Sequence, residues 1–234
     1  VVKAMASAKD AYPSVVALFR HDIAKLGFET QAARDARRRE LFAKVDHEFN
    51  AYVHDVVRLT PTIVELIVHA PAAARNFEPG QFYRLQNFEA RSHVVDGSRL
   101  AMEGIALTGA WVDKERGLLS MIALEMGVSS RLIAALKKGE QVVVMGPTGS
   151  PTEIPESGQL VLLAGGGLGN AVLFSIAKAM RANGDKVLYF AGYKKGEDIF
   201  KRDEVEVATD QVIWCTDTGA TLDPRRPQDR HFRG

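Results

Sequence analysis

The chain has 234 residues, enough for one large domain or two small ones. Its 30 lysines and arginines against 29 aspartates and glutamates leave a formal charge of +1. This balance excludes a protein built mainly to bind nucleic-acid backbone, because such proteins carry a concentrated positive field. With 46% hydrophobic and 25% charged residues, the chain has the composition of a globular protein that can bury a core.

The only cysteine, Cys215, excludes an internal disulfide framework, a metal site made of cysteines alone and an iron–sulfur cluster held by these residues. A reduced, cytoplasmic compartment is expected. The apolar run at 15–19 is too short for a signal peptide, and no stretch approaches the ~20 apolar residues that span a bilayer. The start at Val1 and the stop at Gly234, after an expected loop over 222–233, indicate a piece of a longer polypeptide.

Residues 1–50 are expected to form a helical extension. Apolar residues recur at helical spacing up to Leu26, and Gly27 favours a helix end there. A second helix is expected over 30–49, with Leu41, Phe42, Val45 and Phe49 on one side. The arginine-rich segment 34–39 favours a solvated or partner-facing surface over a phosphate site.

Residues 51–150 have the pattern of a β domain. Strand-forming residues at 53–68 are interrupted by Thr60-Pro61, and further strands are expected over 81–87, 104–110, 118–124 and 141–145. One helix over 129–137 interrupts them. Short strands separated by turns at this spacing predict an antiparallel barrel or sandwich.

Residues 158–234 alternate strands with helices, after a linker near 150–158. Apolar strands are expected over 160–164, 187–191 and 211–215, with helices over 171–182 and 203–208 between them. This order predicts a parallel sheet with helices on its faces. The fold class is therefore α+β with two domains, a β-barrel followed by an incomplete Rossmann-like α/β domain, plus the N-terminal helical extension.

The sharpest local motif is Gly165-Gly166-Gly167-Leu168-Gly169-Asn170, between an apolar strand and a helix. Glycines at such a turn let the backbone approach a diphosphate, and the helix N-terminus offers free N–H groups. The spacing differs from G-x-G-x-x-G, and no acidic residue clearly ends the next strand. A nucleotide site is favoured over a tight packing turn, which is the alternative.

Two weaker signals lie in the β region. The segment Gly127-Val128-Ser129-Ser130 precedes a helix and suits a phosphate, although Ser129 alone is a good N-cap. In the run 77–85, Tyr83 and Leu85 alternate with Phe82 and Arg84. Tyr83 is either a ring that stacks on a planar ligand or a core aromatic.

The order of these segments resembles the ferredoxin–NADP reductase superfamily over roughly residues 49–219. The matching runs are PGQF, IALT, GVSSRLIAALKKGEQVVVMGPTG, LVLLAGGGLGNA and CTDTG. The likeness is to its multi-subunit branch: the electron-transfer subunit of dihydroorotate dehydrogenase, and the small subunit of sulfide dehydrogenase and NADH-dependent ferredoxin–NADP oxidoreductase.

The resemblance implies an FAD site and an NAD(P)H site, with no catalytic and no metal-binding residue. FAD would lie along 81–85 and 104–108, with its diphosphate on 127–130; NAD(P)H would lie on 165–170 and at the ends of the next two strands. The implied cofactor-binding residues are Tyr83, Arg84, Leu85, Ile105, Ala106, Leu107, Thr108, Gly127, Val128, Ser129, Ser130, Gly165, Gly166, Gly167, Leu168, Gly169, Asn170, Tyr193, Thr216, Asp217 and Thr218.

The chain departs from the superfamily where Arg-x-Tyr-Ser is usual, because Glu103 and Ala106 stand there. The cation for a diphosphate would then come from Arg84, Arg91, Arg99 or Arg131. The branch's C-terminal cysteine cluster is absent, so a [2Fe-2S] cluster is expected only if the natural chain continues beyond Gly234. Lys194, Lys195, Lys201 and Arg202 suit a 2′-phosphate or plain solvation, and the branch slightly favours NADH.

The sequence thus predicts a flavin-dependent module that passes electrons from NAD(P)H through FAD to a partner subunit or fused domain of a larger complex. The cofactors do this chemistry, and the protein supplies binding and orientation. The N-terminal helices would be a docking element. The alternative is a cofactor-free scaffold, which Glu103 and Ala106 favour. A glycine-loop nucleotide switch is disfavoured because the P-loop Lys-Ser/Thr pair is missing.

Overall fold

The computed structural model describes residues 2–27 and 29–234. It divides into two compact units, Val1–Lys44 and Val45–Gly234. The first holds α1 (Val2–Leu18), α2 (Arg20–Lys25) and most of α3 (Gln31–Phe49), as the sequence predicts. Apolar side chains of α3 are exposed, Leu41 by 59% and Phe42 by 63%. Within the described ranges, no helix has the length and apolar character needed to cross a membrane.

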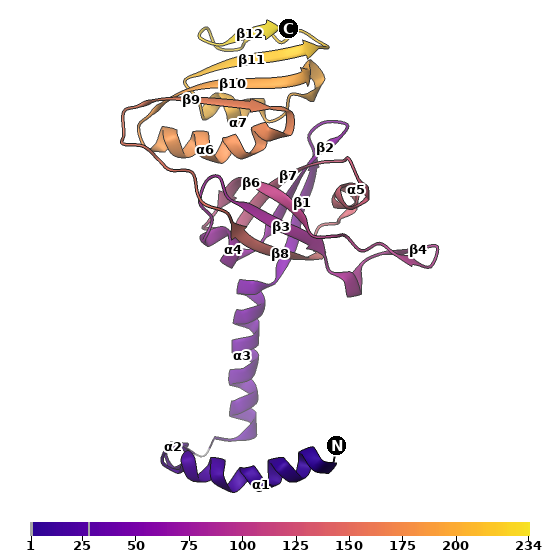
Figure 1. The fold of residues 1–234 in the computed structure, drawn as a ribbon, viewed down its shortest axis with the longest axis vertical. Coiled ribbons are helices and arrows are strands. Elements are labelled where there is room, and N and C mark those ends of the chain that lie inside the picture. Colours follow the sequence, from indigo (N-terminus) through magenta and orange to yellow (C-terminus); the bar gives the residue numbers. More distant parts are fainter. Residues whose placement is uncertain (1, 28) are drawn as a thin grey trace. The chain divides into compact units, whose positions relative to one another are not determined.

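The second unit begins with a closed barrel of six antiparallel strands, drawn in Figure 1. Neighbouring strands follow the order β1-β2-β7-β6-β3-β8. Val64, Leu66, Tyr83 and Leu119 are fully buried in its core, because alternate residues of each strand point inward. The strands are β1 (Ala51–Arg58), β2 (Ile63–His69), β3 (Phe82–Asn87), β6 (Ile105–Asp113), β7 (Leu118–Leu124) and β8 (Gln141–Thr148).

Four shorter elements that the sequence did not predict connect the barrel strands. They are α4 (Pro71–Arg75), the 3-10 turn η1 (Glu89–Arg91) and the hairpin of β4 (Val94–Val95) and β5 (Ser98–Arg99). The helix predicted over 129–137 is α5 (Val128–Ala135). It ends early because Leu136 has an extended backbone, with its side chain buried.

The C-terminal part is a four-stranded parallel sheet in the order β12-β11-β10-β9. Strand β12 lies in the segment predicted as a loop over 222–233, so that prediction is wrong there. Its sequence, RHFR, has no apolar run, and its pairing with β11 makes it a strand. The elements are β9 (Leu160–Gly166), η2 (Gly167–Gly169), α6 (Asn170–Ala182), β10 (Lys186–Lys195), η3 (Gly196–Asp198), α7 (Arg202–Val207), β11 (Gln211–Thr218) and β12 (Arg230–Arg233).

Both helices of this part lie on the sheet face that is turned towards the barrel (Figure 1). Phe174, Tyr189 and Trp214 share one core cluster with the barrel residues Ile63 and Ile122. The prediction of helices on the sheet's faces holds for this face. In the described part of the chain no helix covers the other face, where Leu160 is 73% and Leu162 60% exposed.

A buried polar network ties the barrel to α7. Glu65 of β2 is 2% exposed, and its carboxylate accepts hydrogen bonds from Ser120 Oγ at 2.5 Å and Trp111 Nε1 at 2.7 Å. Lys201, just before α7, pairs with Glu65 at 2.8 Å and with Glu204 at 2.7 Å. The network links three barrel strands to the start of a helix under the sheet.

Candidate cofactor site

The glycine loop after β9 leaves its backbone open. A Cβ added at Gly166, Gly167 or Gly169 would meet no heavy atom within 4 Å. Gly167 has a φ of +52°, in the left-handed region that favours glycine. The loop sits at the carboxyl end of a parallel strand and leads into α6, where ligands bind in open α/β sheets and where helix N–H groups are free.

Asn170 supports this loop from beneath. Its side chain is fully buried. The amide Nδ2 donates hydrogen bonds to the carbonyls of Gly167 at 2.9 Å and Gly192 at 3.1 Å. The amide Oδ1 accepts a hydrogen bond from the Tyr189 hydroxyl at 2.7 Å. A Cβ at Gly165 would collide with this amide. The side chain of Asn170 therefore shapes the loop, and a contact between this residue and a cofactor stays a prediction.

The ends of β10 and β11 divide into buried and exposed side chains. Tyr193 is 5% exposed, and its hydroxyl has no hydrogen-bond partner among the described residues. Thr216 is 2% exposed, and its hydroxyl shares a hydrogen bond of 2.9 Å with His231. Both residues are buried, and their contact with a cofactor stays a prediction. Asp217 and Thr218 are exposed there. A cavity of about 410 Å³ lies beside them, lined in part by Thr62, Lys195, Glu197, Thr218 and Gly219.

The turn before α5 is also open. A Cβ at Gly127 would meet nothing within 4 Å, and Val128 is 76% exposed. The Ser130 hydroxyl accepts the N–H groups of Met126 at 3.0 Å and Gly127 at 2.9 Å, while Ser129 Oγ accepts the N–H of Glu103 at 3.2 Å. The hydroxyls hold the turn, and Gly127, not Ser129, is the N-cap. An anion would meet the first-turn N–H groups.

Strands β3 and β6 present one face outward, where Arg84 and Ala106 are paired and exposed. Thr108 on the same face and Ile105 beside it are partly exposed. Tyr83 and Leu85 are fully buried, and Leu107 is 6% exposed. These three side chains fill the barrel core, and a contact between these residues and a cofactor stays a prediction.

The sequence left two roles open for Tyr83, a ring that stacks on a ligand and a core aromatic. In the structure its side chain is a core aromatic. Its hydroxyl donates to the carbonyl of Ala73 at 3.0 Å, and its ring stacks on Phe77 at a centroid distance of 5.9 Å. Burial raises the pKa of this hydroxyl well above its ordinary value. Tyr83 therefore stays a neutral, buried side chain.

Of the four arginines that could supply the cation for a diphosphate, two already contact other groups. Arg99 donates to the carbonyls of Glu89, Ala90 and Ser92, each at 3.2 Å, and Arg91 lies over the ring of Phe88 at 5.6 Å. Arg84 and Arg131 form no ion pair within the described part of the chain. They are the cations left for a diphosphate.

Sequence reasoning missed the apolar rim of this surface. Met126 is 79% and Met145 41% exposed, one beside the Gly127 turn and the other beside Gly104. Their sequence signal was a single apolar residue next to a glycine turn. Arg58 was missed as well; it pairs with Glu125 at 2.6 Å, and this hydrogen bond holds the Glu125 pKa below its usual range.

The two open turns lie on the same side of the unit. The η2 turn contacts β7, and Leu168 of η2 packs in the same cluster as Leu124, the last residue of β7. Gly127 follows Leu124 by only three residues. One surface thus carries two backbone turns that each suit a diphosphate.

No protein-family model matches the chain. An uncharacterized protein of Rickettsia prowazekii is 36% identical over 163 residues, which are 70% of this chain and 21% of that protein. The dihydroorotate dehydrogenase B (NAD(+)) electron transfer subunit homolog of Thermotoga maritima is 30% identical over 165 residues, which are 70% of this chain and 54% of that protein.

A solved NADH-dependent reduced ferredoxin–NADP oxidoreductase, studied for flavin-based electron bifurcation, superposes with a TM-score of 0.63 and 27% identity. The match covers 74% of this chain and 58% of that one. The chain resembles the ferredoxin–NADP reductases in sequence and in fold. Its barrel and parallel sheet are the two parts of the ferredoxin–NADP reductase-like fold, preceded by N-terminal helices. It spans between about a fifth and three fifths of the length of these relatives.

Proposed function

We propose that the chain is the electron-transfer module of a flavin-dependent NAD(P)H oxidoreductase. Electrons pass from NAD(P)H through FAD to a partner subunit or fused domain in a larger complex. The observation that carries this proposal is the pair of open turns, at Gly127 and at Gly166–Gly169, on one side of the unit. Each leaves room for a diphosphate where any side chain would intrude, so the residues present fit both cofactors.

The proposed FAD site is narrower than the sequence indicated. The turn 127–130 holds the diphosphate, Arg84 and Arg131 supply positive charge, and the outward face at Ala106 and Thr108 lies along the ring system. Tyr83, Leu85 and Leu107 contribute backbone only. FAD bound there would supply hydride acceptance and single-electron release, and the residues around it would orient the two ring systems and exclude water.

We propose that NADH, and not NADPH, is the donor. Two of the four cations considered for a 2′-phosphate are already paired: Lys201 with Glu65 and Glu204, and Arg202 with Glu206 at 2.7 Å. Lys194 and Lys195 remain, both exposed. The nicotinamide dinucleotide then lies on Gly166–Gly169 and reaches Asp217 and Thr218. A cytoplasmic location stays a prediction, as does an iron–sulfur cluster beyond Gly234.

The alternative, a cofactor-free scaffold, gains no support from the comparisons, whose named members are reductases or electron-transfer subunits. Glu103 and Ala106 remain its only sequence support. Saturable binding of either cofactor would remove it.

Isothermal titration calorimetry tests the proposal with one variant in each turn. Gly127→Val should weaken FAD binding at least tenfold and leave NADH binding unchanged; Gly166→Val should do the reverse. Ala164→Val is the matched control, because Ala164 lies two residues before Gly166 on β9 and is also exposed. If the wild-type chain binds neither FAD nor a nicotinamide nucleotide, the proposal is wrong.

A further inference from the structure

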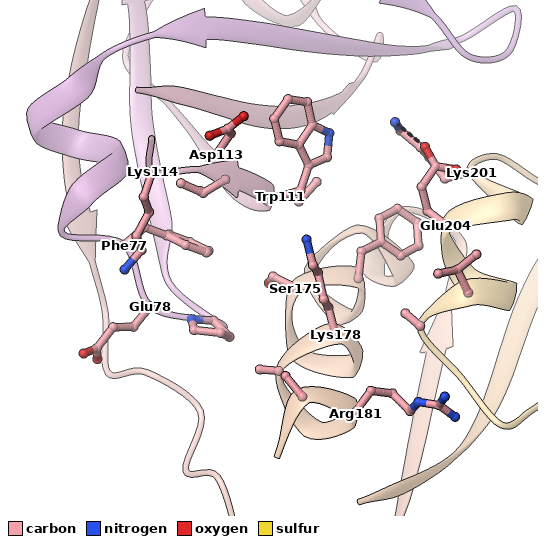
Figure 2. A pocket seen from close by; sticks show the side chains of 18 residues that line it. Phe77, Glu78, Trp111, Asp113, Lys114, Ser175, Lys178, Arg181, Lys201 and Glu204 are labelled. Carbon is pink, nitrogen blue, oxygen red and sulfur yellow. Dashed lines mark hydrogen bonds and ion pairs between the residues drawn. The ribbon is translucent and has the colours of Figure 1, made fainter. Parts of the chain in front are cut away.

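A second cleft lies between the barrel and the α6–α7 layer, and we call it the α6 cleft. It has a volume of about 980 Å³ and is lined by β6, α6, α7 and the loop before β3. Its lining includes three aromatic residues, Phe77, Trp111 and Phe174, of which Figure 2 labels the first two. Small-molecule sites have this size and this apolar lining, and they occur preferentially where domains meet.

The α6 cleft is separate from the proposed cofactor surface. The glycine loop leads into the first residue of α6, Asn170, whereas the cleft is lined by the last two turns of the helix, from Phe174 to Ala182. At 1.5 Å per residue, Lys178 lies about 12 Å along the helix from Asn170. A ligand in the cleft would therefore not occupy the cofactor turns.

Two lysines of the α6 cleft, Lys114 and Lys178, carry no ion pair among the described residues. Lys178 reaches from α6 towards Trp111 in Figure 2, and Lys114 stands on the barrel wall. Within the described ranges neither lysine forms an ion pair. By contrast, Arg181 pairs with Asp210 at 2.5 Å, and Lys201 is held by Glu65 and Glu204.

The carboxylates of the lining leave these lysines unpaired. Asp113 accepts the N–H groups of Glu115 at 3.1 Å and Arg116 at 3.0 Å in its own turn. The carboxylate of Glu78 points away from the cleft in Figure 2. The single proton of the Ser175 hydroxyl is also engaged, because the carbonyls of Val172 at 3.1 Å and Gly109 at 3.3 Å both lie within its reach. Lys114 and Lys178 thus offer N–H donors to a bound molecule, and Lys178 is the one that extends towards Trp111.

We propose that the α6 cleft binds a small molecule with a flat aromatic body and one carboxylate. The three rings form the walls for the flat body, and the Lys178 ammonium meets the anion. A hydrogen bond between two charged groups is stronger than a neutral one, which makes the charge decisive for binding. The inference does not depend on the proposed function.

The probe is 2-naphthoate, titrated into the full 234-residue chain and followed by the two tryptophan indole N–H signals in NMR. The Trp111 signal should move saturably, and by more than that of Trp214, which is fully buried and does not line the cleft. A Trp111→Phe variant assigns the two signals. Calorimetry should give one site, and the neutral analogue 2-naphthalenemethanol should bind about tenfold more weakly, the size of one charge-assisted hydrogen bond.

Substitutions decide whether Lys178 makes the contact. Lys178→Gln should weaken 2-naphthoate about tenfold, and Lys178→Arg should stay within about threefold of wild type. Lys138→Gln, at an exposed turn lysine outside the cleft, should change nothing. An unchanged Trp214 signal shows that each variant is folded.

Three results would overturn the proposal: a Trp111 signal that does not move at saturation, wild-type affinity in Lys178→Gln, or displacement of 2-naphthoate by excess FAD or NADH. Loss of binding in Leu162→Glu, on the bare face of the sheet, would also overturn it by placing the probe there. Retained binding in that variant, with loss in Lys178→Gln, supports the site.

Discussion

At the scale of single residues, the glycine loop depends on one buried amide. Asn170 joins the loop carbonyl of Gly167 to Gly192 and Tyr189 of the neighbouring strand, and it fills the space that Gly165 leaves free. The loop is therefore held in shape before any ligand arrives. That arrangement reduces the ordering cost of binding.

Asn170→Ala should lower the free energy of unfolding by about 2 kcal/mol, because it leaves buried polar groups without partners. Urea unfolding measures this loss. Asn76→Ala is the control, since Asn76 is exposed and bonds only to the carbonyl of Ala72, and it should change stability by less than about 0.5 kcal/mol. Equal effects in the two variants would contradict the role of Asn170.

Cys215 should react slowly with iodoacetamide. Burial raises the pKa of its thiol, so less reactive thiolate is present at a given pH than for an ordinary cysteine of pKa about 8.5. The alkylation rate of the folded chain should still rise with pH above that value, whereas the urea-unfolded chain should level off near it. A folded-state rate that levels off below pH 8 would contradict the raised pKa.

The sequence predicted the alternation of side chains along 82–85 but not its direction. Both faces carry an aromatic residue, Phe82 on one and Tyr83 on the other, so local hydrophobicity does not tell which face is inside. The register with β6 and β8 and the hydroxyl bond to Ala73 decide it. The structural role of Asn170 could not be predicted from the sequence either, because Tyr189 and Gly192, two of its hydrogen-bond partners, lie on another strand.

At the scale of elements, the ion pair between Glu65 and Lys201 fixes the start of α7 against the barrel. Both side chains are buried, 3% and 11% exposed. A buried pair of this kind adds little stability over an apolar pair, but removing one partner leaves an uncompensated charge. Its role is therefore to specify how the two parts meet.

Lys201→Met should lower the free energy of unfolding by about 3 kcal/mol, since Glu65 stays buried without its cation. The double variant Glu65→Gln with Lys201→Met should recover part of this loss, and Lys194→Met, at an exposed lysine, should have little effect. Guanidinium unfolding measures all three. A double variant no more stable than Lys201→Met alone would show that the pair is not coupled.

Elements with a strong local pattern were predicted well, and those decided by pairing were not. Strand β7 has the predicted limits, Leu118–Leu124, because an apolar run stands between clear turns. Strand β12 is short and mostly polar, and β4 and β5 have two residues each, so only their partners define them. The open turns at Gly127 and Gly166–Gly169 were predictable from glycines before helices.

At the scale of the whole second unit, the sheet is unusual because no helix of the described residues covers one of its faces. Parallel sheets are nearly always covered on both faces, because their strands are apolar on both. Here Leu160, Leu162 and Phe232 are exposed by 58% or more. An apolar surface of this kind favours association.

The 234-residue chain should therefore self-associate as its concentration rises, and Leu160→Lys with Leu162→Lys should suppress this. Sedimentation velocity measures it over a concentration series. Lys substitutions at Leu41 and Phe42, in the N-terminal unit, test whether exposed apolar helix residues contribute instead. A wild-type chain that stays monomeric throughout would contradict the expected role of the bare face.

The central claim is electron transfer between two cofactors held by the open turns. The most direct measurement is anaerobic addition of NADH to the FAD-loaded chain, with the visible absorbance of the flavin followed by stopped flow. The account predicts rapid bleaching in the wild type and in Ala164→Val, and bleaching at least tenfold slower in Gly166→Val with FAD still bound. An FAD-loaded wild type that neither NADH nor NADPH bleaches would contradict it.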